Sequence, residues 1–433
     1  MANIQEIYEP QVFKEAKGRP EWEKAMEAEH ESLMKNQNWY LTALPSGKKP
    51  IGCKWVYKVK YKANGTLDKY KTRLVAKGFS QREGIDYEET FAPTTKMSTI
   101  HLVPAMATQN GWKVHQMDVK SAFLNGDLKE VVYMYQPEGF QVAGKEHLVC
   151  RLKKALYGLE QAPRAWYIKI DMYLVQQGFQ RSPSDSNLYV KRVGNEIILL
   201  VVYVDDIIIT GSEVDAITWI KSNMSRAFDM TDLGLLHYCL GVEVWQTGSN
   251  IFVSQAKYAR TLLDKFRMED CKISSTPMEK GLKLSAKTDS KAVSESLYRQ
   301  LVGSLIYLTT TRPDLSFAMS FISRFMTAPK VEHWTTAKRV LRYVKGTLDF
   351  GILYNRSKDP RLCGYTNLDW AGSVDDKKST FGYVFSLGTG AVTWTSKKQH
   401  AVALSSTEAE YRGALKGACE AIWLRRMLSD MQM

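Results

Sequence analysis

The stretch from Glu196 to Gly211 places the strongest constraint on how this chain can fold. It reads EIILLVVYVDDIIITG, two short apolar runs rich in β-branched residues on either side of Asp205 and Asp206. Runs of this length and composition predict two buried strands rather than a helix. Adjacent carboxylates at the junction of buried strands repel each other and lose hydration, so they need a positive charge nearby. Mg²⁺ is the simplest candidate, because it binds hard oxygen ligands and tolerates paired carboxylates.

Two other interpretations of this stretch stay open at this point. Asp is a good turn residue, so the pair could form only the tight turn of a hairpin. A membrane span is disfavoured, because the apolar run is shorter than the roughly 20 residues that a bilayer requires and the acids interrupt it. The rest of the chain has to decide between these interpretations.

The charge of the chain points to a polyanionic partner. The 433 residues include 59 Lys and Arg against 46 Asp and Glu, which gives a formal charge of +13 and a pI near 9.2. A basic excess of this size favours nucleic acid or a similar polyanion, although a generically basic protein is the alternative. At about 150 residues per domain, the length predicts about three units.

The cysteines and the N-terminal sequence indicate an intracellular protein. The six cysteines form no CxxC pair and no Cys/His metal spacing, which is typical of scattered reduced thiols. The N-terminal residues contain no apolar segment, so no secretory signal is expected. No transmembrane segment, low-complexity tract or internal repeat is evident.

Residues 51–79 predict a basic β-hairpin. Apolar and basic residues alternate at period two, and Asn64 and Gly65 lie between the two runs as a hairpin turn. One face is expected to carry the lysines Lys54, Lys58, Lys60 and Lys62, and the other Trp55, Tyr57, Val59 and Tyr61. Such a hairpin suits a phosphate backbone or a triphosphate. A solvated face of an antiparallel sheet is the plainer alternative.

A third carboxylate follows in the segment after that hairpin. Residues 97–111 predict a helix that Pro104 kinks or ends, and His101 is unusual within it. Residues 114–119 then alternate like a strand, with Asp118 near its end. With Asp205 and Asp206, Asp118 would complete the ligands for two metal ions ~4 Å apart, which activate a 3′-hydroxyl and stabilise a leaving pyrophosphate. Taken alone, Asp118 would be a surface or strand-end acid.

The remaining segments predict a mixture of helices and strands. We expect a helix over 20–36 after a short turn that Pro10 opens, and a loop leading into a helix over 148–179. Gln161 and Arg164, where that helix begins, could meet a nucleotide or serve as caps and surface charges. Strands should alternate with a helix over 225–283, and helices should dominate 296–348. The last helix carries basic residues that could line a duplex or form a solvated face: Lys338, Arg339, Arg342 and Lys345.

The C-terminal segment from Asp349 onward predicts a second small α/β unit. Several strands are expected there, the last of them at 400–406. A helix should follow, with Thr407 as its N-cap and Glu410 completing a capping box.

Several long motifs in this order resemble those of the copia-type LTR retrotransposon Pol polyprotein. They are KWVYKVKYKANGTLDKYKTRLVAKGFSQREGIDYEETFAP, HQMDVKSAFLNGDL, VYMYQPEGF, LKKALYGLEQAPRAWY, YVDDIIITG, DWAG, KKSTFGYVF and SSTEAEY. The resemblance covers nearly the whole chain from about Glu21. It implies an α+β right-hand polymerase with fingers, palm and thumb, a connection, and a truncated ribonuclease H-like α/β unit. The implied divisions are an N-terminal helical extension at 1–50, fingers and palm at 51–240, thumb and connection at 241–348, and a partial ribonuclease H-like domain at 349–433.

The resemblance also implies roles for individual residues in an RNA-directed DNA polymerase. Asp118, Asp205 and Asp206 match the metal-binding triad, which would hold two Mg²⁺ ions. Phe123 matches the aromatic ring that excludes a 2′-hydroxyl. The nucleotide-binding positions of the family fall on Lys71, Arg73, Lys77 and Gln161.

The ribonuclease H part departs from the family pattern. Asn367 stands where the family has the first metal-binding acid, and Asp369 lies ~6.6 Å further along the strand. Glu410 matches the second acid, and the third would come after Met433. We therefore expect no ribonuclease H activity.

The resemblance implies an RNA template, a DNA primer or RNA–DNA hybrid, and dNTPs as partners, with no membrane. The life cycle of the family implies the cytoplasm and the nucleus. The alternative function is that of a non-catalytic, nucleic-acid-binding relic of the element, because capsid, protease and integrase segments are absent from the sequence. The sequence does not determine the oligomeric state.

Overall fold

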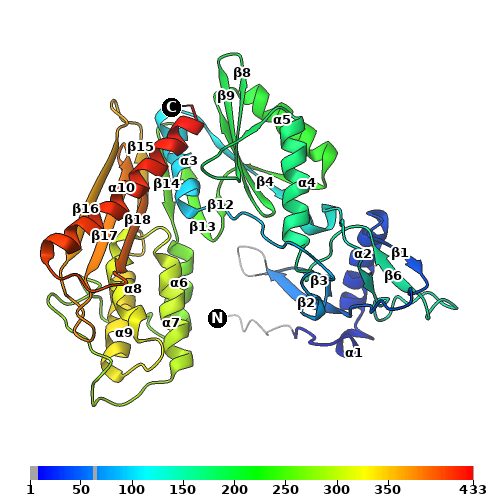
Figure 1. Cartoon of the computed structure of the whole chain (residues 1–433), viewed down its shortest axis with the longest axis horizontal. Coiled ribbons are helices and arrows are strands. Elements are labelled where there is room, and N and C mark those ends of the chain that lie inside the picture. The colour runs from blue at the N-terminus through cyan, green and yellow to red at the C-terminus, as the bar shows by residue number, and fades with distance from the viewer. Residues whose placement is uncertain (1–7, 62–65, 433) are drawn as a thin grey trace. The chain divides into compact units, whose positions relative to one another are not determined.

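Helices and sheets are mixed along the chain in the computed structural model, which describes residues 8–61 and 66–432 (Figure 1). The chain divides into two compact units, and it passes between them repeatedly. The first unit is formed by Met1–Thr94, Val119–Gln180 and Met224–Thr231, and the second by Thr95–Asp118, Arg181–Asn223 and Asp232–Met433. Within the described ranges, no helix is long and apolar enough to cross a membrane.

The basic hairpin of the first unit forms as expected. Strand β2 (Cys53–Tyr61) pairs antiparallel with β3 (Leu67–Ala76), whereas the expected Asn64-Gly65 turn lies outside the described residues. Trp55, Tyr57 and Val59 are buried on one face, and the predicted lysines of the other face, Lys54, Lys58 and Lys60, are exposed. Lys62, also expected there, lies outside the described residues. Tyr61 was expected on the buried face but is 46% exposed. It lies at the end of β2, beyond the register shift after Lys60.

Helix α2 (Pro20–Lys35) packs against β3, with Pro20 in its first turn as predicted (Figure 1). The buried ring of Trp22 contacts Tyr57 and Tyr70 edge-on, at centroid distances of 5.4 and 4.7 Å. These aromatic contacts fix the helix on the inner face of the hairpin.

The rest of the first unit surrounds a small sheet in the order β1-β6-β5. Its strands are β1 (Trp39–Thr42), β5 (Tyr133–Met134) and β6 (Val149–Leu152). Strand β6 lies where the sequence predicts a loop, because its apolar run is short. The other elements are α1 (Phe13–Ala16), which begins three residues after Pro10, the 3₁₀ turns η1 (Gly78–Ser80) and η2 (Ala122–Asn125), and α4 (Ala162–Gln176), which has Pro163 in its first turn.

A six-stranded sheet in the order β11-β4-β10-β9-β8-β7 lies mostly in the second unit. Its strands are β4 (Val114–Val119), β7 (Gln180–Arg181), β8 (Leu188–Val193), β9 (Glu196–Tyr203), β10 (Asp206–Gly211) and β11 (Met230–Leu235). The prediction of strands at 114–119 and on both sides of the Asp pair is therefore confirmed. Helix α5 (Val214–Ala227) follows β10.

Helix α3 (Met97–Asn110) runs through Pro104, so the alternative that Pro104 ends the helix is wrong. Nearly every side chain from His101 to Gln109 is buried, and this packing outweighs the loss of one helical hydrogen bond at proline. His101 also has a structural explanation. Its ring nitrogens lie 3.1 Å from the Tyr354 hydroxyl and 2.7 Å from the Thr310 carbonyl oxygen.

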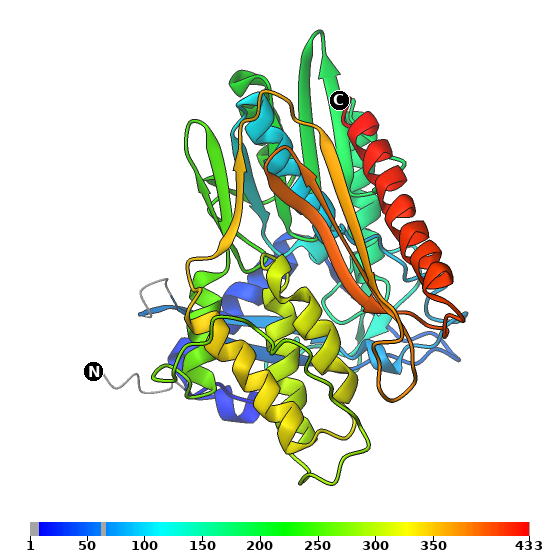
Figure 2. The same ribbon diagram turned by 90° about the vertical axis from the view of Figure 1, so that its left-hand side faces the viewer.

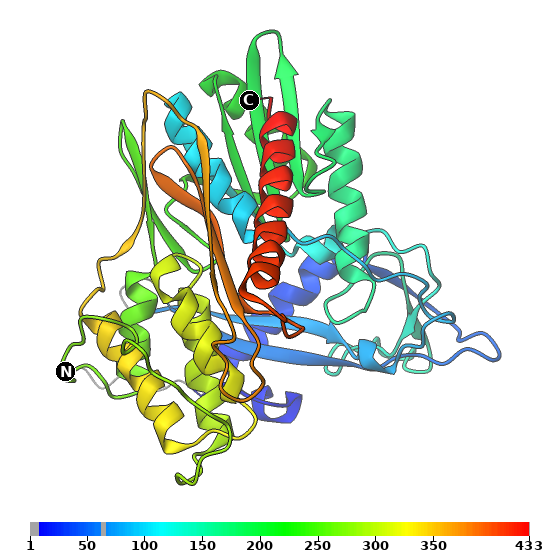
Figure 3. The same ribbon diagram turned by 60° about the vertical axis from the view of Figure 1, so that its left-hand side comes forward.

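A second sheet and a group of helices follow in the second unit. The sheet is formed by β12 (Tyr238–Cys239), β13 (Val242–Gln246), β14 (Asn250–Ser254) and β15 (Gly351–Asn355) in that order. Its last strand thus pairs with a strand about 100 residues earlier. The helices share one buried core and gather together in Figure 3: α6 (Ala256–Lys265), α7 (Glu295–Leu308), α8 (Ser316–Ile322) and α9 (Val331–Lys345), with the 3₁₀ turns η3 (Pro313–Leu315) and η4 (Ser323–Phe325).

Most of the basic side chains of α9 bind a neighbouring loop. Arg339 pairs with Glu279 at 3.1 Å. Arg342 and Lys345 donate to the carbonyl oxygens of Lys272 and Cys271, each at 2.7 Å. These three side chains hold the 271–279 loop against the helix. This contact differs from both predictions for this face, which were that it lines a duplex or is solvated.

The C-terminal segment forms a three-stranded antiparallel sheet covered by one long helix (Figure 2). The strands are β16 (Leu362–Asp369), β17 (Thr380–Leu387) and β18 (Gly390–Lys398), and the helix is α10 (Ser406–Asp430). The strand expected at 400–406 is absent from this described stretch. The N-cap is Ser405 rather than Thr407, and its side chain accepts from the backbone N–H of Glu408 at 3.1 Å.

Candidate active site

The three predicted catalytic carboxylates lie at one end of the central strands of the six-stranded sheet. Strand β10 pairs with β4 in a register that places Asp206 directly opposite Asp118. On its other side β10 pairs with β9, where Asp206 is opposite Tyr203. Val204 and Asp205 therefore form a two-residue turn between β9 and β10. The structure brings Asp118 and Asp206 together as cross-strand neighbours, with Asp205 adjacent in the turn.

The turn that carries Asp205 is strained. Val204 has a φ of +58° and is 41% exposed. Positive φ suits a two-residue hairpin, but it is rare for a β-branched side chain. Such strain is typical of functional sites, where the surrounding fold holds an unfavourable conformation in place. Here the long buried strands on both sides fix the position of the turn.

Burial and like charges act together on Asp206. Loss of hydration raises the pKa of its carboxyl group, and the charges of Asp205 and Asp118 raise it further. A hydrogen bond opposes this effect: the Gln116 side-chain N–H donates to Asp206 Oδ1 at 2.8 Å. Gln116 is almost completely buried and lies on the same face of β4 as Asp118. The alternation of β4 in the sequence already placed Gln116 on the face of Asp118, although no role was predicted for Gln116.

The donor set fits a hard divalent cation by its chemistry. Three carboxylates supply oxygen ligands, and burial together with the charges of Asp205 and Asp118 raises the pKa of Asp206, a shift that a bound cation would oppose. Among the described residues, however, no group of three or more His, Cys, Asp or Glu side chains is already arranged to hold a metal ion. Asp118 and Asp206 are paired across strands, and Asp205 lies in the adjoining turn.

Another buried group beside the acids was also missed. Cys239, in β12, is 5% exposed, and burial together with the charges of Asp206 and Asp205 raises the pKa of its thiol. It therefore stays protonated and behaves as a small apolar side chain next to the carboxylates.

In the first unit, Tyr157 brings two of the predicted nucleotide-binding residues together. The Arg73 guanidinium lies over the Tyr157 ring, 4.7 Å from its centroid. Phe123 meets the same ring at 5.3 Å in a T-shaped contact. Tyr157 lies in the quoted LKKALYGLEQAPRAWY motif, but nothing in its spacing indicated this contact.

Lys71 lies within strand β3, and Lys77 is the residue directly after it. Lys71 is half-buried opposite Lys58, and burial together with the charge of Arg73 lowers the pKa of its ammonium group. Lys77 is exposed directly after β3, and its backbone N–H donates to the Gly52 carbonyl oxygen at 2.8 Å. The hairpin therefore presents cations along its length.

Gln161 is buried at the N-cap of α4, only 2% exposed. Its amide oxygen accepts from Gln81 at 3.1 Å, and its amide nitrogen donates to the Asp86 carbonyl oxygen at 3.3 Å. The side chain therefore connects α4 to the segment after η1. The backbones of Gly78 and Gly158 approach so closely that a Cβ on either residue would clash with the other strand or loop.

The three residues of the predicted nuclease site are divided between two elements. Asn367 and Asp369 are exposed on β16 and face away from α10, because Gly413 and Gly417 of α10 pack against the intervening side chains Leu368 and Thr366. Glu410 is exposed on α10 itself. The structure therefore does not bring Glu410 together with Asn367 and Asp369.

Comparison with known proteins matches the chain to a reverse transcriptase family and to proteins of transposons. Residues 36–280 match the model of a family described as reverse transcriptase (RNA-dependent DNA polymerase). The chain is 44% identical to the Retrovirus-related Pol polyprotein from transposon TNT 1-94 of Nicotiana tabacum, over 99% of this chain and 33% of that protein. It is 32% identical to a putative transposon Ty5-1 protein of Saccharomyces cerevisiae, over 68% of this chain and 97% of that protein. The chain thus spans about a third of the length of the plant relative.

Among solved structures, telomerase from Candida albicans, in complex with a fragment of telomeric RNA, aligns with 76% of this chain and 66% of its own. The identity is 10% and the TM-score is 0.27. A score this low supports no statement about the fold.

Proposed function

Because this chain belongs to the reverse transcriptase (RNA-dependent DNA polymerase) family, we propose that it copies RNA into DNA by extending a primer 3′-hydroxyl with dNTPs. The comparisons also confirm the resemblance to copia-type retrotransposon Pol polyproteins. The observation that carries the proposal is the register that pairs Asp206 with Asp118 and places Asp205 in the adjoining turn.

The three carboxylates would be the metal ligands of this reaction. Asp118, Asp205 and Asp206 would hold two Mg²⁺ ions, whose chemistry is to activate the 3′-hydroxyl and to stabilise the leaving pyrophosphate. Gln116 would keep Asp206 oriented, since its N–H holds one carboxylate oxygen and leaves the other for a ligand. The strained turn at Val204 would keep Asp205 at the end of the hairpin.

The first unit would supply the residues that handle the nucleotide. The cations Lys71, Arg73 and Lys77 would neutralise the triphosphate, and Gln161 would position the loop before α4. Phe123 would exclude a 2′-hydroxyl by its ring. Tyr157 would act as a positioning residue, because it contacts both Arg73 and Phe123.

In this proposal the architecture is a right hand. The hairpin of β2 and β3 belongs to the fingers, the six-stranded sheet to the palm, and helices α6 to α9 to the thumb and connection. The template would be RNA, and the products a DNA strand and an RNA–DNA hybrid.

Primer extension tests the polymerase proposal. The parent chain should incorporate dNTPs on an RNA template with Mg²⁺, whereas Asp205→Asn should lose at least 100-fold in rate, because it removes one metal-binding charge. Asp215→Asn, an exposed acid in α5 of the same unit, is the matched control and should keep full activity. If folded parent protein extends no primer, the chain is instead the non-catalytic nucleic-acid-binding relic.

We propose further that the C-terminal unit has no ribonuclease H activity. Asn367 lacks the charge of the family acid, and the sheet separates it from Glu410. Because the sheet separates position 367 from Glu410, Asn367→Asp should not create cleavage of an RNA–DNA hybrid in Mg²⁺ or Mn²⁺. Metal-dependent cleavage by the parent chain that disappears in Glu410→Gln would contradict this proposal.

A further inference from the structure

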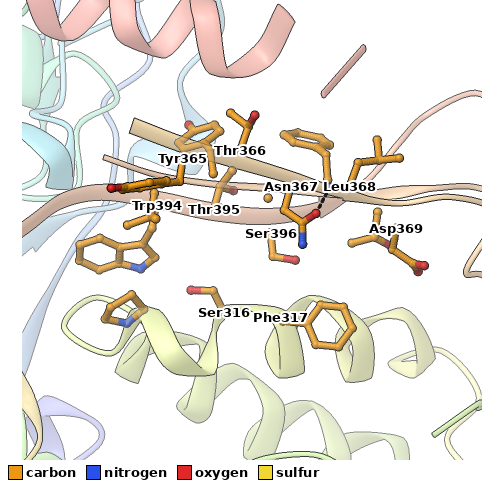
Figure 4. Close-up of a pocket in the computed structure, with 16 residues that line it drawn as sticks. Ser316, Phe317, Tyr365, Thr366, Asn367, Leu368, Asp369, Trp394, Thr395 and Ser396 are labelled. Atoms are coloured by element: carbon orange, nitrogen blue, oxygen red, sulfur yellow. Dashed lines mark hydrogen bonds between the residues drawn. The ribbon is translucent and has the colours of Figure 1, made fainter. Parts of the chain in front are cut away.

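A cavity of about 470 Å³ lies between α8 and the sheet of β16, β17 and β18 in the second unit (Figure 4). Asn367, Asp369 and Ser396 point from the strands toward α8, which contributes Ser316 and Phe317. Thr366 and Leu368 point the opposite way, toward α10. The cavity therefore occupies the face of the sheet that α10 leaves uncovered.

The alternation of the three strands creates the floor of this cavity. Asn367 of β16 is paired with Gly382 of β17, which in turn is paired with Ser396 of β18. Because Gly382 has no side chain, the centre of the floor is flat, with an amide on one side and a hydroxyl on the other. The Asn367 oxygen accepts from the Leu368 backbone N–H at 2.8 Å, so its NH₂ group is the part that can donate outward.

Aromatic rings line the same cavity. Tyr365 of β16 is 71% exposed and Phe317 of α8 is 48% exposed, and Trp394 of β18 lies deeper. The Trp394 indole N–H already donates to the Thr309 carbonyl oxygen at 2.9 Å. Single exposed aromatic residues are ordinary, but exposed rings around a cavity with a polar floor are typical of a site for a planar ligand.

Positive charge adjoins the cavity. A second cavity of about 740 Å³ shares six lining residues with the first, among them Ser316, Trp394 and Ser396. Its lining includes the cations Arg324, Lys397, Lys398 and Lys416, with Glu420 as the one carboxylate among the described lining residues. Asp376 pairs with Lys398 at 2.8 Å, so part of this charge is balanced within the protein. The remaining excess suits phosphate groups attached to a base held in the first cavity.

We propose that this cavity binds a base of a single-stranded nucleic acid, with stacking on Tyr365 and Phe317 and with phosphates along the neighbouring cations. Base stacking on aromatic side chains, combined with a basic groove, is the usual physical basis of single-strand binding. The carboxylates Asp118, Asp205 and Asp206 do not line this cavity. It is therefore a binding site in addition to the proposed polymerase centre.

Photo-crosslinking tests where the base binds. The full chain is irradiated in EDTA with a single-stranded oligonucleotide that carries 5-iododeoxyuridine, and the crosslinked peptides are identified by mass spectrometry. We expect crosslinks to peptides that contain Tyr365 or Phe317. Crosslinks confined to residues 51–240 would overturn the proposal while leaving the polymerase function intact.

Affinity measurements test whether stacking holds the ligand. Tyr365→Ala and Phe317→Ala should each weaken binding of oligothymidylate by about 5-fold or more, and binding of an abasic oligomer of equal length should not change. Tyr365→Phe keeps the ring and should bind like the parent. Tyr411→Ala is the matched control, because Tyr411 is 75% exposed on α10 and does not line the cavity.

Two outcomes of these measurements would reject the base-binding site. Equal losses for oligothymidylate and the abasic oligomer would show phosphate contact without stacking. If the alanine variants instead abolish self-association in sedimentation and leave oligonucleotide binding unchanged, the cavity is an interface with a second copy of this chain. Circular dichroism of each variant confirms that the fold is retained, and the exposure of both rings favours this.

Discussion

At the scale of single residues, the carboxylates at the β9–β10 turn oppose stability. Burial of Asp206 and the negative charges of Asp205 and Asp118 each raise the pKa of its carboxyl group. A site of this kind stores repulsion that a bound cation would relieve. The cost is retained because neutral residues at these positions would lack the charge that the proposed chemistry needs.

Asp206→Asn should therefore raise the free energy of unfolding while abolishing primer extension. We expect a gain of about 0.5–1 kcal/mol without added metal, because the amide removes one charge and solvent screens part of the effect. The Asn oxygen can still accept from Gln116. Urea denaturation of the parent, Asp206→Asn and the exposed control Asp215→Asn measures this. A destabilised Asp206→Asn would show that the carboxylate has a favourable partner instead.

The sequence was sufficient to predict that the three carboxylates lie at the ends of neighbouring strands, but not their supporting contacts. The motif and the strand pattern predict Asp118, Asp205 and Asp206 as the site residues, and the register places them side by side. Gln116 and Tyr157 were missed, because a hydrogen bond across strands or a ring contact between distant segments depends on register and packing. The separation of Asn367 from Glu410 was not predicted for the same reason. Alternation shows which side chains of a strand share a face, but not which face a helix covers.

At the scale of elements, helix α10 begins with a capping arrangement two residues before the predicted one. The Ser405 side chain accepts from the Glu408 backbone N–H at 3.1 Å, and Glu408 Oε2 accepts from the Leu404 backbone N–H at 2.7 Å. The sequence SSTEAE contains two candidate N-caps with an acid three residues later, and only the packing of α10 on β16 and β17 selects between them.

Removal of the true cap should cost more than removal of the predicted one. Ser405→Ala should lower the free energy of unfolding by about 1 kcal/mol, because it leaves a helix N–H without its acceptor. Thr407→Ala, in the first turn, should change it by less than about 0.5 kcal/mol. Equal losses in thermal or urea denaturation would contradict the assignment of Ser405 as the N-cap.

Helix α3 contains a buried titratable group that should make stability depend on pH. Burial of His101 lowers its pKa to about 4 from the usual 6.5, although its contact with the Thr310 carbonyl opposes the shift. Below pH 6.5 the unfolded chain therefore takes up a proton that the folded chain refuses. The free energy of unfolding should fall as the pH drops from 6.5 toward 4, by up to about 3 kcal/mol.

Comparison with His101→Gln isolates this effect from the titration of other groups. The variant should be less stable than the parent at pH 7.5, because it loses part of the contact with Tyr354 and Thr310. The difference between the two proteins should shrink as the pH falls. A constant difference between pH 7.5 and pH 5 would show that His101 does not titrate in this window.

Most elements could be predicted from the sequence because their patterns are local. The alternation in β2 and β4, the apolar β-branched runs of β9 and β10 and the helical spacing in α2 and α9 were sufficient. Predictions failed where distant packing decides. Apolar residues at 400–406 suggested a strand, but no neighbouring strand pairs with them in the described structure. Helix α3 continues through Pro104 because its residues are buried on nearly all sides.

At the scale of the whole molecule, each unit is assembled from segments that are far apart in the sequence. One buried core of the second unit contains Leu199 and Ile208 from the β9–β10 hairpin together with Val244, Tyr354 and Leu424. Roughly half of the described buried residues of this core lie after residue 240. No local pattern predicted this arrangement, because it depends on strands and helices that lie far apart in the chain and meet only in the folded core.

A fragment of residues 1–240 should therefore fail to fold stably, although it contains all three carboxylates. Without the later segments, Leu199, Ile208 and the buried face of α3 would meet water, and each exposed large side chain costs about 1.5–3 kcal/mol. We expect the fragment to bind a hydrophobic dye, to lack the near-ultraviolet circular dichroism of the full chain and to extend no primer. Co-expression with residues 241–433 should restore folding if the shared core is the cause. A fragment that unfolds cooperatively by itself would show instead that the six-stranded sheet and α3 are sufficient for stability, and that the C-terminal segments only cover them.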